Sequence, residues 1–420
     1  MLKTKFRFFS SIEIAAFLCV LLIYTKIVPV YIRQPFLCVF KNDEISQITG
    51  IVCSNPNKTS KGNVYIFNVK TNKAISKNGD FCDSSGIISV MAPTNLIEAH
   101  YPGKLYHDFG SVIENGVKIQ LKNLRNFKSS EKKKNETPLF YCEKIETNGW
   151  KNAFAKIRAV FRIQFKRLMF QWRGAGGLLL ALLSGSREYT DTNLANAFRN
   201  AGLSHILALS GMHLSFFSGI ATKTGKGIFG KKYVGIFSLF AIFTFVWFAG
   251  LSPSLFRALI CSILLLFFNT INLKVSMFTI LSCSFIIQAI IFPQDVNAIA
   301  FILSYGALLG IILFSKPFQK IINPFCPKKI ANSLAASVGA QFITLPVSLS
   351  VFGSFASIGI IATVIVSPLI SLFLLLGFAL VIISLLIPPL LEPLGVIINI
   401  VYNIINYMVC FFAQAPSISI

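Results

Sequence analysis

Two histidines in the apolar run GLSHILALSGMHLSF are the first candidates for chemistry in this chain. His205 and His213 are two of only four histidines, and Ser210 and Gly211 lie between them. A serine hydroxyl becomes a nucleophile when an imidazole reaches it and a carboxylate orients that imidazole. Two imidazoles can also begin a metal site, or line a polar path through a membrane. The residue types leave three kinds of site open.

Catalysis and metal binding both lack further residues that they require. Ser210 and His213 are three apart, a spacing that makes any two residues neighbours on a helix. The nearest acids are Glu188 and Asp191, and no glycine elbow surrounds the serine. No His-x-His, Cys-x-x-Cys or His-Glu-x-x-His pattern adds metal ligands. We therefore expect no catalytic residue, no metal and no cofactor, and keep a membrane-embedded hydrolase using Ser210 and His213 as an alternative.

The composition identifies the class of protein that must position these residues. The chain has 420 residues, of which 54% are hydrophobic and 13% charged, and its mean hydropathy is +0.68. These values are typical of a polytopic α-helical membrane protein. The net charge of +23 indicates a strong excess of cations on cytoplasmic loops or a polyanionic partner.

The N-terminal third is predicted to hold an anchor followed by a small β domain. An apolar stretch from about Phe8 to Ile32 is longer than a signal-peptide core and has no small-residue cleavage site, so it predicts a retained anchor over residues 1–32. Residues 33–150 alternate in short runs such as GNVYIFNVK, separated by turn sequences such as SNPN and KNGD. This pattern predicts about five to seven strands in a barrel or sandwich.

Four of the nine cysteines lie in this β-rich region, at Cys38, Cys53, Cys82 and Cys142. If the region faces an oxidising compartment, one or two disulfides are expected, and the sequence indicates no pairing.

Residues 151–173 carry seven bases and no acid. Phe154, Ile157, Phe161, Phe165, Leu168 and Trp172 recur at spacings of three or four, while Lys156, Arg162, Lys166 and Arg167 point away from that face. The pattern predicts a basic amphipathic helix on a membrane surface, with its cations near anionic lipid or another polyanion.

The remainder, residues 174–420, is a series of apolar runs. Their centres, near 212, 242, 263, 284, 307, 343, 365, 381 and 403, predict about ten spans together with the anchor. Lysines gather in connections at 223–232, at Lys274 and at 316–329. If these connections and the N-terminus are cytoplasmic, the positive-inside rule holds and residues 33–150 lie outside the cytoplasmic membrane.

Polar residues within these spans form the candidate site. An ionisable residue in a span loses hydration, so it normally faces the interior of the bundle or a water-filled path. Single serines and glycines also serve helix packing, but two arginines and two histidines together favour a path. The candidate path residues are Arg199, His205, Ser210, Gly211, His213, Arg257, Ser304 and Gln341.

The order and spacing of four segments resemble the competence domain of the ComEC family, the membrane channels through which bacteria take up transforming DNA. The segments are GLLLALLSGSREYTDTNLANAFRNAGLSHILALSGMHLSF, GLSPSLFRALICS, AIAFILSYGALLGIILF and SVGAQFITLPVSLSVFGSFASIGIIATVIVSPL. The resemblance covers roughly residues 174–370, and the Gly-Leu-Ser-His and Ser-Gly-x-His block is its most specific part.

The resemblance implies a channel for single-stranded DNA in the cytoplasmic membrane. It also implies that residues 33–150 form an extracytoplasmic OB-like domain, in which Tyr65 and Phe67 are candidates for stacking on bases. A separate DNA receptor, nuclease and cytoplasmic motor are the expected partners, and the oligomeric state stays open. The His-rich metallo-β-lactamase motif of many relatives does not occur in this sequence, so we expect no nuclease activity in the chain. A related transporter without a competence role is a further alternative.

Overall fold

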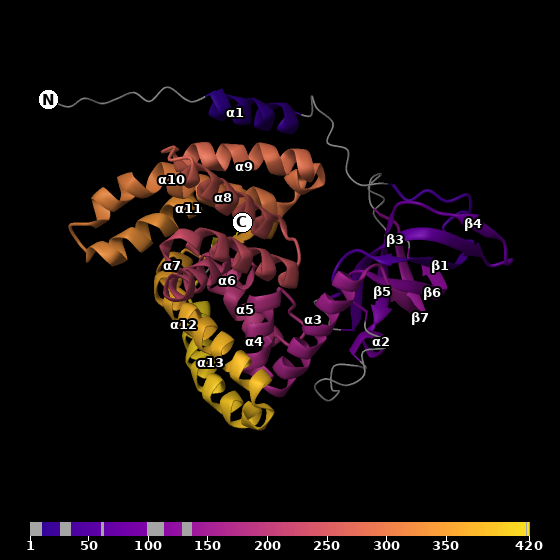
Figure 1. The fold of residues 1–420 in the computed structure, drawn as a ribbon. Coiled ribbons are helices and arrows are strands. Elements are labelled where there is room, and N and C mark those ends of the chain that lie inside the picture. The colour runs from indigo at the N-terminus through magenta and orange to yellow at the C-terminus, as the bar shows by residue number, and fades with distance from the viewer. Residues whose placement is uncertain are drawn as a thin grey trace. The chain divides into compact units, whose positions relative to one another are not determined.

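The computed structural model describes residues 11–25, 35–59, 63–98, 113–127, 137–416 and 418–419. Its contacts divide the chain into two compact units (Figure 1). The barrel unit consists of Ile32–Thr192 and Phe373–Asn403, and the helical unit consists of Met1–Tyr31, Asn193–Leu372 and Ile404–Ile420.

Seven strands and one short helix form the β region of the barrel unit. They are β1 (Ile45–Val52), β2 (Asn57–Lys58), β3 (Val64–Ser76), β4 (Phe81–Asp83), β5 (Ile87–Pro93), α2 (Thr94–Glu98), β6 (Val117–Asn126) and β7 (Leu139–Trp150). β1 pairs with both β3 and β6, so five strands close into a barrel in the order β1-β3-β5-β7-β6. The pairing of β5 with β7 is parallel and the other pairings of the barrel are antiparallel.

The strands form where apolar residues alternate with polar ones. Along β3, Tyr65, Phe67 and Val69 point into the barrel and are buried, and their neighbours are half-buried. Period-two burial is the signature of a strand with one face on a core. Gly50 allows β1 to approach β3, because a Cβ there would lie 2.4 Å from the Lys70 carbonyl oxygen. The strands predicted for the polar region are present. Cys38 and Cys82 place their sulfur atoms 3.3 Å apart, while the number of disulfides stays a prediction.

Two helices follow the barrel within the same unit. α3 (Ala153–Gln171) begins at Asn152, whose side chain accepts a hydrogen bond from the Ala155 N–H, as an N-cap residue does. α4 (Arg173–Ser184) follows after Trp172. The Trp172 Nε1–H donates to the Leu391 carbonyl at 2.9 Å and the Asn399 Nδ2–H donates to the Trp172 carbonyl at 3.0 Å. These bonds tie α3 and α4 to the part of the C-terminal helix that belongs to the barrel unit.

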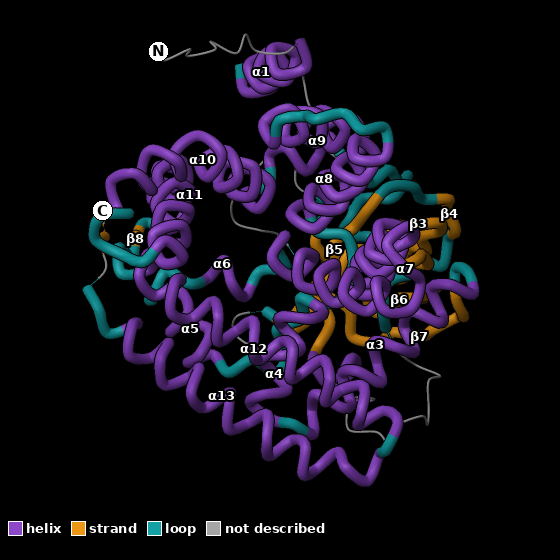
Figure 2. The backbone as a smooth tube through the Cα atoms, turned by 60° about the vertical axis from the view of Figure 1, so that its left-hand side comes forward, coloured by secondary structure: helices purple, strands orange, loops and turns teal. Residues whose placement is uncertain are grey.

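The helical unit contains most of the remaining elements. They are α1 (Ser11–Tyr24), α5 (Thr192–Asn200), α6 (Ser204–Leu207), α7 (Gly211–Ala249), α8 (Pro253–Thr270), α9 (Met277–Ile291), η1 (Pro293–Asn297), α10 (Ile299–Ile322), α11 (Lys328–Phe352), and β8 (Ser354–Phe355) paired with β9 (Ile418–Ser419). α12 (Gly359–Leu386) and α13 (Leu391–Ala413), which η2 (Pro388–Leu390) joins, each contribute to both units. Within the helical unit, α1 lies beside α9 and α10 lies beside α11 (Figures 1 and 2).

Five described helices are long and apolar enough to cross a membrane, namely Pro253–Thr270, Ile299–Ile322, Lys328–Val351, Gly359–Leu386 and Pro388–Ala413. Four shorter apolar helices accompany them, at Ser11–Tyr24, Arg173–Ser184, Tyr233–Ala249 and Met277–Ile291. The predicted helical membrane architecture is therefore present.

Two of the predicted spans differ from the structure. The runs centred near 365 and 381 form one continuous helix, α12, which continues through Pro368. The prediction of two spans there is wrong. The predicted anchor, residues 1–32, contains α1, and its residues 1–10 and 26–32 lie outside the described part of the chain.

A single glycine folds α7 into a hairpin. Gly230 has φ 73° and ψ 173°, a conformation that glycine adopts without a Cβ clash, and it interrupts the helix. The two arms, residues 211–229 and 231–249, fold back on each other, since Ser218 Oγ and Ser238 Oγ lie 2.7 Å apart. Both ends of α7 therefore lie at the same end of the hairpin.

Candidate functional site

The Ser-Gly-x-His motif caps the N-terminus of α7. Ser210 is the N-cap residue in extended conformation, and its backbone N–H donates to Nδ1 of His213 at 3.2 Å. In a capping box the residue at the third helical position returns a side-chain acceptor to the N-cap N–H, and His213 takes that role here. Because Nδ1 accepts, the neutral ring carries its proton on Nε2.

This geometry bears on the hydrolase alternative. Ser210 Oγ lies 3.4 Å from His213 Nδ1, but the same nitrogen already accepts from the Ser210 backbone. His213 is 0% exposed, and its Nε2 has no hydrogen-bond partner among the described residues. A triad needs a carboxylate on that second nitrogen. The helix cap therefore explains why the side chains of Ser210 and His213 lie close together.

Arg257 on α8 brings a second motif to the same place. α8 begins at Ser252, whose side chain accepts from the Leu255 N–H, and Pro253 follows at the first helical position. Arg257 Nη2 lies only 3.7 Å from the position that a Cβ on Gly211 would occupy. The Ser-Gly-x-His and Ser-Pro-Ser-Leu-Phe-Arg segments, separate in the sequence, thus meet at the start of α7.

The Arg257 guanidinium is held from one side by α10. Its Nη1–H donates to the Ser304 carbonyl oxygen at 2.7 Å, and the group lies over the Tyr305 ring at 5.7 Å from the centroid. Ser304 therefore contributes its backbone rather than its hydroxyl. Cation–π contact of this kind stabilises a guanidinium without neutralising its charge.

A buried hydrogen-bond network fixes Tyr305 in turn. The Tyr305 hydroxyl donates to Gln288 Oε1 at 3.0 Å and also lies 3.3 Å from Ser284 Oγ, while the Gln288 Nε2–H donates to the Pro253 carbonyl at 3.1 Å. Ser284 and Gln288 are each 0% exposed. α9 thus joins the start of α8 to α10. Sequence reasoning passed over Gln288, although a glutamine inside an apolar helix is itself a signal of a buried polar contact.

No carboxylate of the described residues pairs with Arg257 in an ion pair, and its buried Nε has no hydrogen-bond partner among them. A guanidinium has five N–H donors in a planar fork that suits phosphate and carboxylate oxygens. Only Nη1 is engaged by a described acceptor. The arrangement can therefore receive an anion at the α7–α8 junction.

The other predicted path residues make no described polar contact with Arg257. Arg199 at the end of α5 and His205 on α6 have exposed side chains, and Gln341 on α11 is half-buried. Within the described part of the chain, no hydrogen bond or ion pair joins any of the three to Arg257. The site that the structure assembles consists of Ser210, Gly211, His213 and Arg257 with the Ser304 carbonyl.

The two aromatic residues predicted to stack on bases lie in the core of the barrel. Tyr65 is 0% and Phe67 is 1% exposed. The Tyr65 hydroxyl donates to Glu98 Oε1 at 2.8 Å, and Lys58 pairs with the same carboxylate at 2.7 Å. In this structure neither ring is accessible to a base, because the inward face of β3 fills the barrel.

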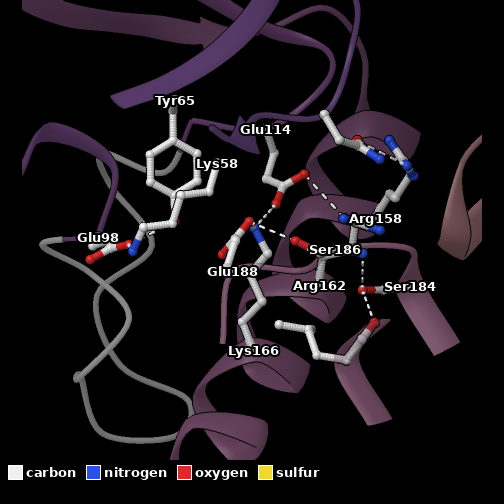
Figure 3. A network of polar contacts seen from close by, with 12 residues as sticks. Lys58, Tyr65, Glu98, Glu114, Arg158, Arg162, Lys166, Ser184, Ser186 and Glu188 are labelled. Atoms are coloured by element: carbon white, nitrogen blue, oxygen red, sulfur yellow. Dashed lines mark hydrogen bonds and ion pairs between the residues drawn. The ribbon is translucent and has the colours of Figure 1, made fainter. Parts of the chain in front are cut away.

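A second group of buried charges, which we call the charge cluster, lies in the barrel unit (Figure 3). It consists of Glu114, Arg162, Lys166 and Glu188. Glu114 contacts Arg162 Nε at 3.1 Å and Lys166 Nζ at 2.9 Å, and Lys166 Nζ also contacts Glu188 at 3.0 Å. The side chains of all four are at most 2% exposed. Glu188 further accepts from the Ser186 hydroxyl at 2.7 Å.

Titration of the cluster follows from this pairing. Burial alone would raise the pKa of Glu114, but Lys166 and Arg162 outweigh it and hold that pKa at about 2. Burial alone would lower the pKa of Lys166, and the two carboxylates raise it instead. Glu114 and Lys166 are therefore both charged at neutral pH.

The charge cluster corrects the prediction for residues 151–173. Arg162, Lys166 and Arg167 are buried inside the unit, so the prediction that these cations face anionic lipid is wrong; Lys156 alone of the four is exposed. Phe154, Ile157 and Phe161 are exposed by 71%, 47% and 58%, whereas Leu168 and Trp172 are buried. Helical periodicity could not reveal Glu114 and Glu188, which contact the buried cations.

Among the described residues, no group of three or more His, Cys, Asp and Glu side chains could hold a metal ion.

Comparison with known proteins places the site in context. The family model described as "Competence protein" matches residues 182–420, more than half of the chain. ComE operon protein 3 of Bacillus subtilis (strain 168) is 26% identical over 194 residues, which cover 46% of this chain and 24% of that protein. Recombination protein 2 of Haemophilus influenzae is 24% identical over 215 residues, which cover 47% of this chain and 27% of that protein. The chain thus spans about a quarter of the length of these curated relatives, and no solved structure matches it significantly.

Proposed function

This chain belongs to the competence protein family, and on that premise we propose that it carries single-stranded DNA across the cytoplasmic membrane during natural transformation. The observation that supports this most is the Arg257 guanidinium, which has no described carboxylate partner and lies against the N-terminus of α7. A DNA strand presents one phosphate charge per nucleotide, so its path needs cations within the membrane.

The strength of the contact also suits conduction. A strand that moves must bind each group favourably enough to enter and weakly enough to leave. Arg257 is already held by the Ser304 carbonyl and the Tyr305 ring, so it offers a passing phosphate some of its donors and keeps its position when that phosphate leaves. The remaining candidates, Arg199, His205 and Gln341, would act at other points along the path.

The orientation follows from the loops. Lys223 and Lys226 near the α7 turn, Lys274 after α8 and Lys328 at the start of α11 are exposed. Placing these connections in the cytoplasm satisfies the positive-inside rule and places the barrel unit's strands outside the cytoplasmic membrane. A receptor and a nuclease outside, and a motor inside, would be supplied by other proteins.

We assign the barrel to the OB-like class, which the strand order β1-β3-β5-β7-β6 and the parallel β5–β7 pair support. OB folds bind single strands on the face of their second and third strands. The outward row here pairs Ile66 with Met91, Met91 with Tyr141, and Tyr141 with Arg125. Tyr141 is half-buried and Arg125 is 74% exposed. An aromatic ring beside an arginine is a typical platform for a base and its phosphate.

The test is delivery of labelled DNA to a nuclease-protected cytoplasmic pool in a transformable strain that lacks the gene. Restoring the chain should restore delivery, and Arg257→Gln should lower it about tenfold, the effect of losing roughly 1.4 kcal/mol of phosphate contact. The exposed Lys156 on α3 provides the control: Lys156→Gln should leave delivery unchanged.

Quantitative immunoblotting of membranes must show equal amounts of each variant. Normal delivery in the deletion strain would favour a transporter without a competence role, and full delivery by Arg257→Gln would remove that residue from the path.

A further inference from the structure

An open pocket of about 220 Å³, which we call the cavity, lies between the two arms of α7 and α8. Its polar lining residues are Ser218 and Thr222 from the first arm, Ser238 from the second, and Ser262 and Asn269 from α8. The other residues of the lining are leucine, isoleucine and glycine, and none of the ten is charged. Five polar groups around one cavity are unusual between helices that lie in lipid, because each loses hydration there.

The polar lining continues from the α7–α8 junction. On the first arm, Gly211, Ser218 and Thr222 recur at helical spacing and share one face. On α8, Ala258, Ser262 and Asn269 do the same. Gly211 and Ala258 are in contact, since a Cβ on Gly211 would lie 3.6 Å from the Ala258 Cβ. The seam that starts beside Arg257 therefore leads into the cavity.

Close helix packing is the ordinary role of small residues in membrane helices, and the α10–α11 pair shows what it looks like. A Cβ on Gly310 would lie 2.2 Å from the Gly339 carbonyl oxygen, so these two backbones touch. In the α7–α8 seam Gly235 also packs closely, since a Cβ there would lie 2.5 Å from Leu266 Cδ1, and a hydrogen bond between the Ser218 and Ser238 hydroxyls joins the two arms. Packing therefore accounts for these contacts, and it leaves the polar side chains of Thr222, Ser262 and Asn269 lining the open cavity.

Hydrogen bonds within the helices do not use up the polar groups of the cavity. The Thr222 hydroxyl donates to the Ser218 carbonyl and the Ser262 hydroxyl to the Ala258 carbonyl. Each hydroxyl oxygen keeps its acceptor lone pairs after it donates. The cavity is large enough to hold water beside these groups.

We propose that this cavity is a water-filled section of the strand's path, in which the phosphodiester backbone moves past neutral hydroxyl and amide groups after it leaves Arg257. The proposal rests on the function proposed above. Neutral groups solvate the strand through water without holding it, whereas a further row of lysines would slow its release.

The experiment measures access of water to single cysteines. Ser238→Cys is placed in a chain whose nine native cysteines are serine, provided that this chain still delivers DNA. Membranes then receive a charged, membrane-impermeant methanethiosulfonate reagent, with and without a single-stranded oligodeoxythymidine. Phe240→Cys is the matched control, because Phe240 lies on the same arm and is 68% exposed on the outside of the helical unit.

Ser238→Cys should react at least tenfold faster than Phe240→Cys, and the oligonucleotide should slow its reaction several-fold. Reaction as slow as that of Phe240→Cys would show a dry cavity and overturn the proposal. Fast reaction that DNA leaves unchanged would also overturn it, because the cavity would lie off the path. Ser262→Cys repeats the measurement if Ser238→Cys reaches the membrane poorly.

Access of water in the absence of DNA does not depend on transformation. Failure of this proposal and failure of the proposed function are therefore distinguishable.

Discussion

The charge cluster of the barrel unit and Arg257 of the helical unit both keep cations out of solvent, but they differ in what faces those cations. Arg162 and Lys166 contact two carboxylates within 3.1 Å. Arg257 contacts a carbonyl oxygen and an aromatic ring. In a buried ion pair the two charges neutralise each other, whereas a cation without a carboxylate partner can still attract an anionic ligand. The comparison teaches that four of the seven bases of residues 151–173 are buried within the fold, whereas one arginine in an apolar helix serves the proposed path.

The largest expected effect comes from breaking the cluster. Glu114→Gln leaves Lys166 and Arg162 without their shared carboxylate, and removing one partner of a buried ion pair costs about 3–5 kcal/mol. Thermal unfolding of the detergent-solubilised chain should shift strongly downward. Glu146→Gln is the control, because Glu146 pairs with Lys122 and Lys144 on the surface. A midpoint for Glu114→Gln that matches the control would contradict the structural role of the cluster.

Acid should weaken the same cluster by a similar amount. The pKa of Glu114 lies at about 2, below its ordinary value of 4.5, so its stabilisation is present above about pH 4.5 and is lost as the pH falls towards 2. A shift of this size corresponds to about 3 kcal/mol. Unfolding midpoints measured from about pH 6 down to about pH 3 should fall for the natural chain more steeply than for Glu114→Gln. Parallel slopes would refute the assignment.

Two tyrosines of the barrel test the same distinction between a role in the fold and a role in binding. The Tyr65 hydroxyl is bonded to Glu98 inside the core, whereas Tyr141 lies on the outward row beside Arg125. Tyr141→Ala should weaken binding of a single-stranded oligonucleotide to the purified full chain roughly tenfold, because stacking contributes about 1–3 kcal/mol per base. Tyr65→Phe should lower thermal stability and leave the affinity unchanged. Fluorescence anisotropy measures both, and equal affinities for natural chain and Tyr141→Ala would exclude that platform.

The smallest effect concerns Ser210 and separates a helix cap from a nucleophile. Ser210→Ala should cost about 1 kcal/mol of stability, and Ser210→Asn should cost little, because asparagine caps helices as well as serine does. DNA delivery by Ser210→Asn should match the natural chain, although the hydroxyl is gone. Loss of delivery in that variant without loss of stability, together with labelling of the natural chain by a serine-directed probe, would restore the hydrolase alternative.

Patterns within one element were predictable from the sequence, and contacts between distant elements were not. Alternation predicted the strands of the barrel, and apolar runs predicted helices long enough to span a membrane. The partner of Arg162 is 48 residues away in the chain, so no local pattern could place Glu114 beside it. The aromatic rings of Tyr65 and Phe67 alternate correctly for a strand, but alternation does not say which face is the core. For α12, two hydropathy maxima predicted two spans, because hydropathy does not report whether the backbone turns between them.

The contact between Gly211 and Arg257 likewise could not be predicted from the sequence. Each motif indicated a polar feature by its residue types, and the family resemblance placed both in one domain. Their contact depends on the turn at Gly230, which returns the second arm of α7 to the level of its start so that α8 begins beside Gly211. A glycine among many in an apolar region carries no sign of such a reversal.

The backbone contact between Gly310 and Gly339 bears on which helices of the helical unit have room to move. With no side chain between them, α10 and α11 cannot slide or approach without a clash, so they behave as a stiff frame. α7 has the opposite construction, with a glycine hinge at Gly230 and open volume between its arms and α8. If the chain conducts DNA as proposed, we expect the hairpin of α7 to adjust at Gly230 to bases of different size, while α10 and α11 hold the Ser304 carbonyl, and with it Arg257, in place.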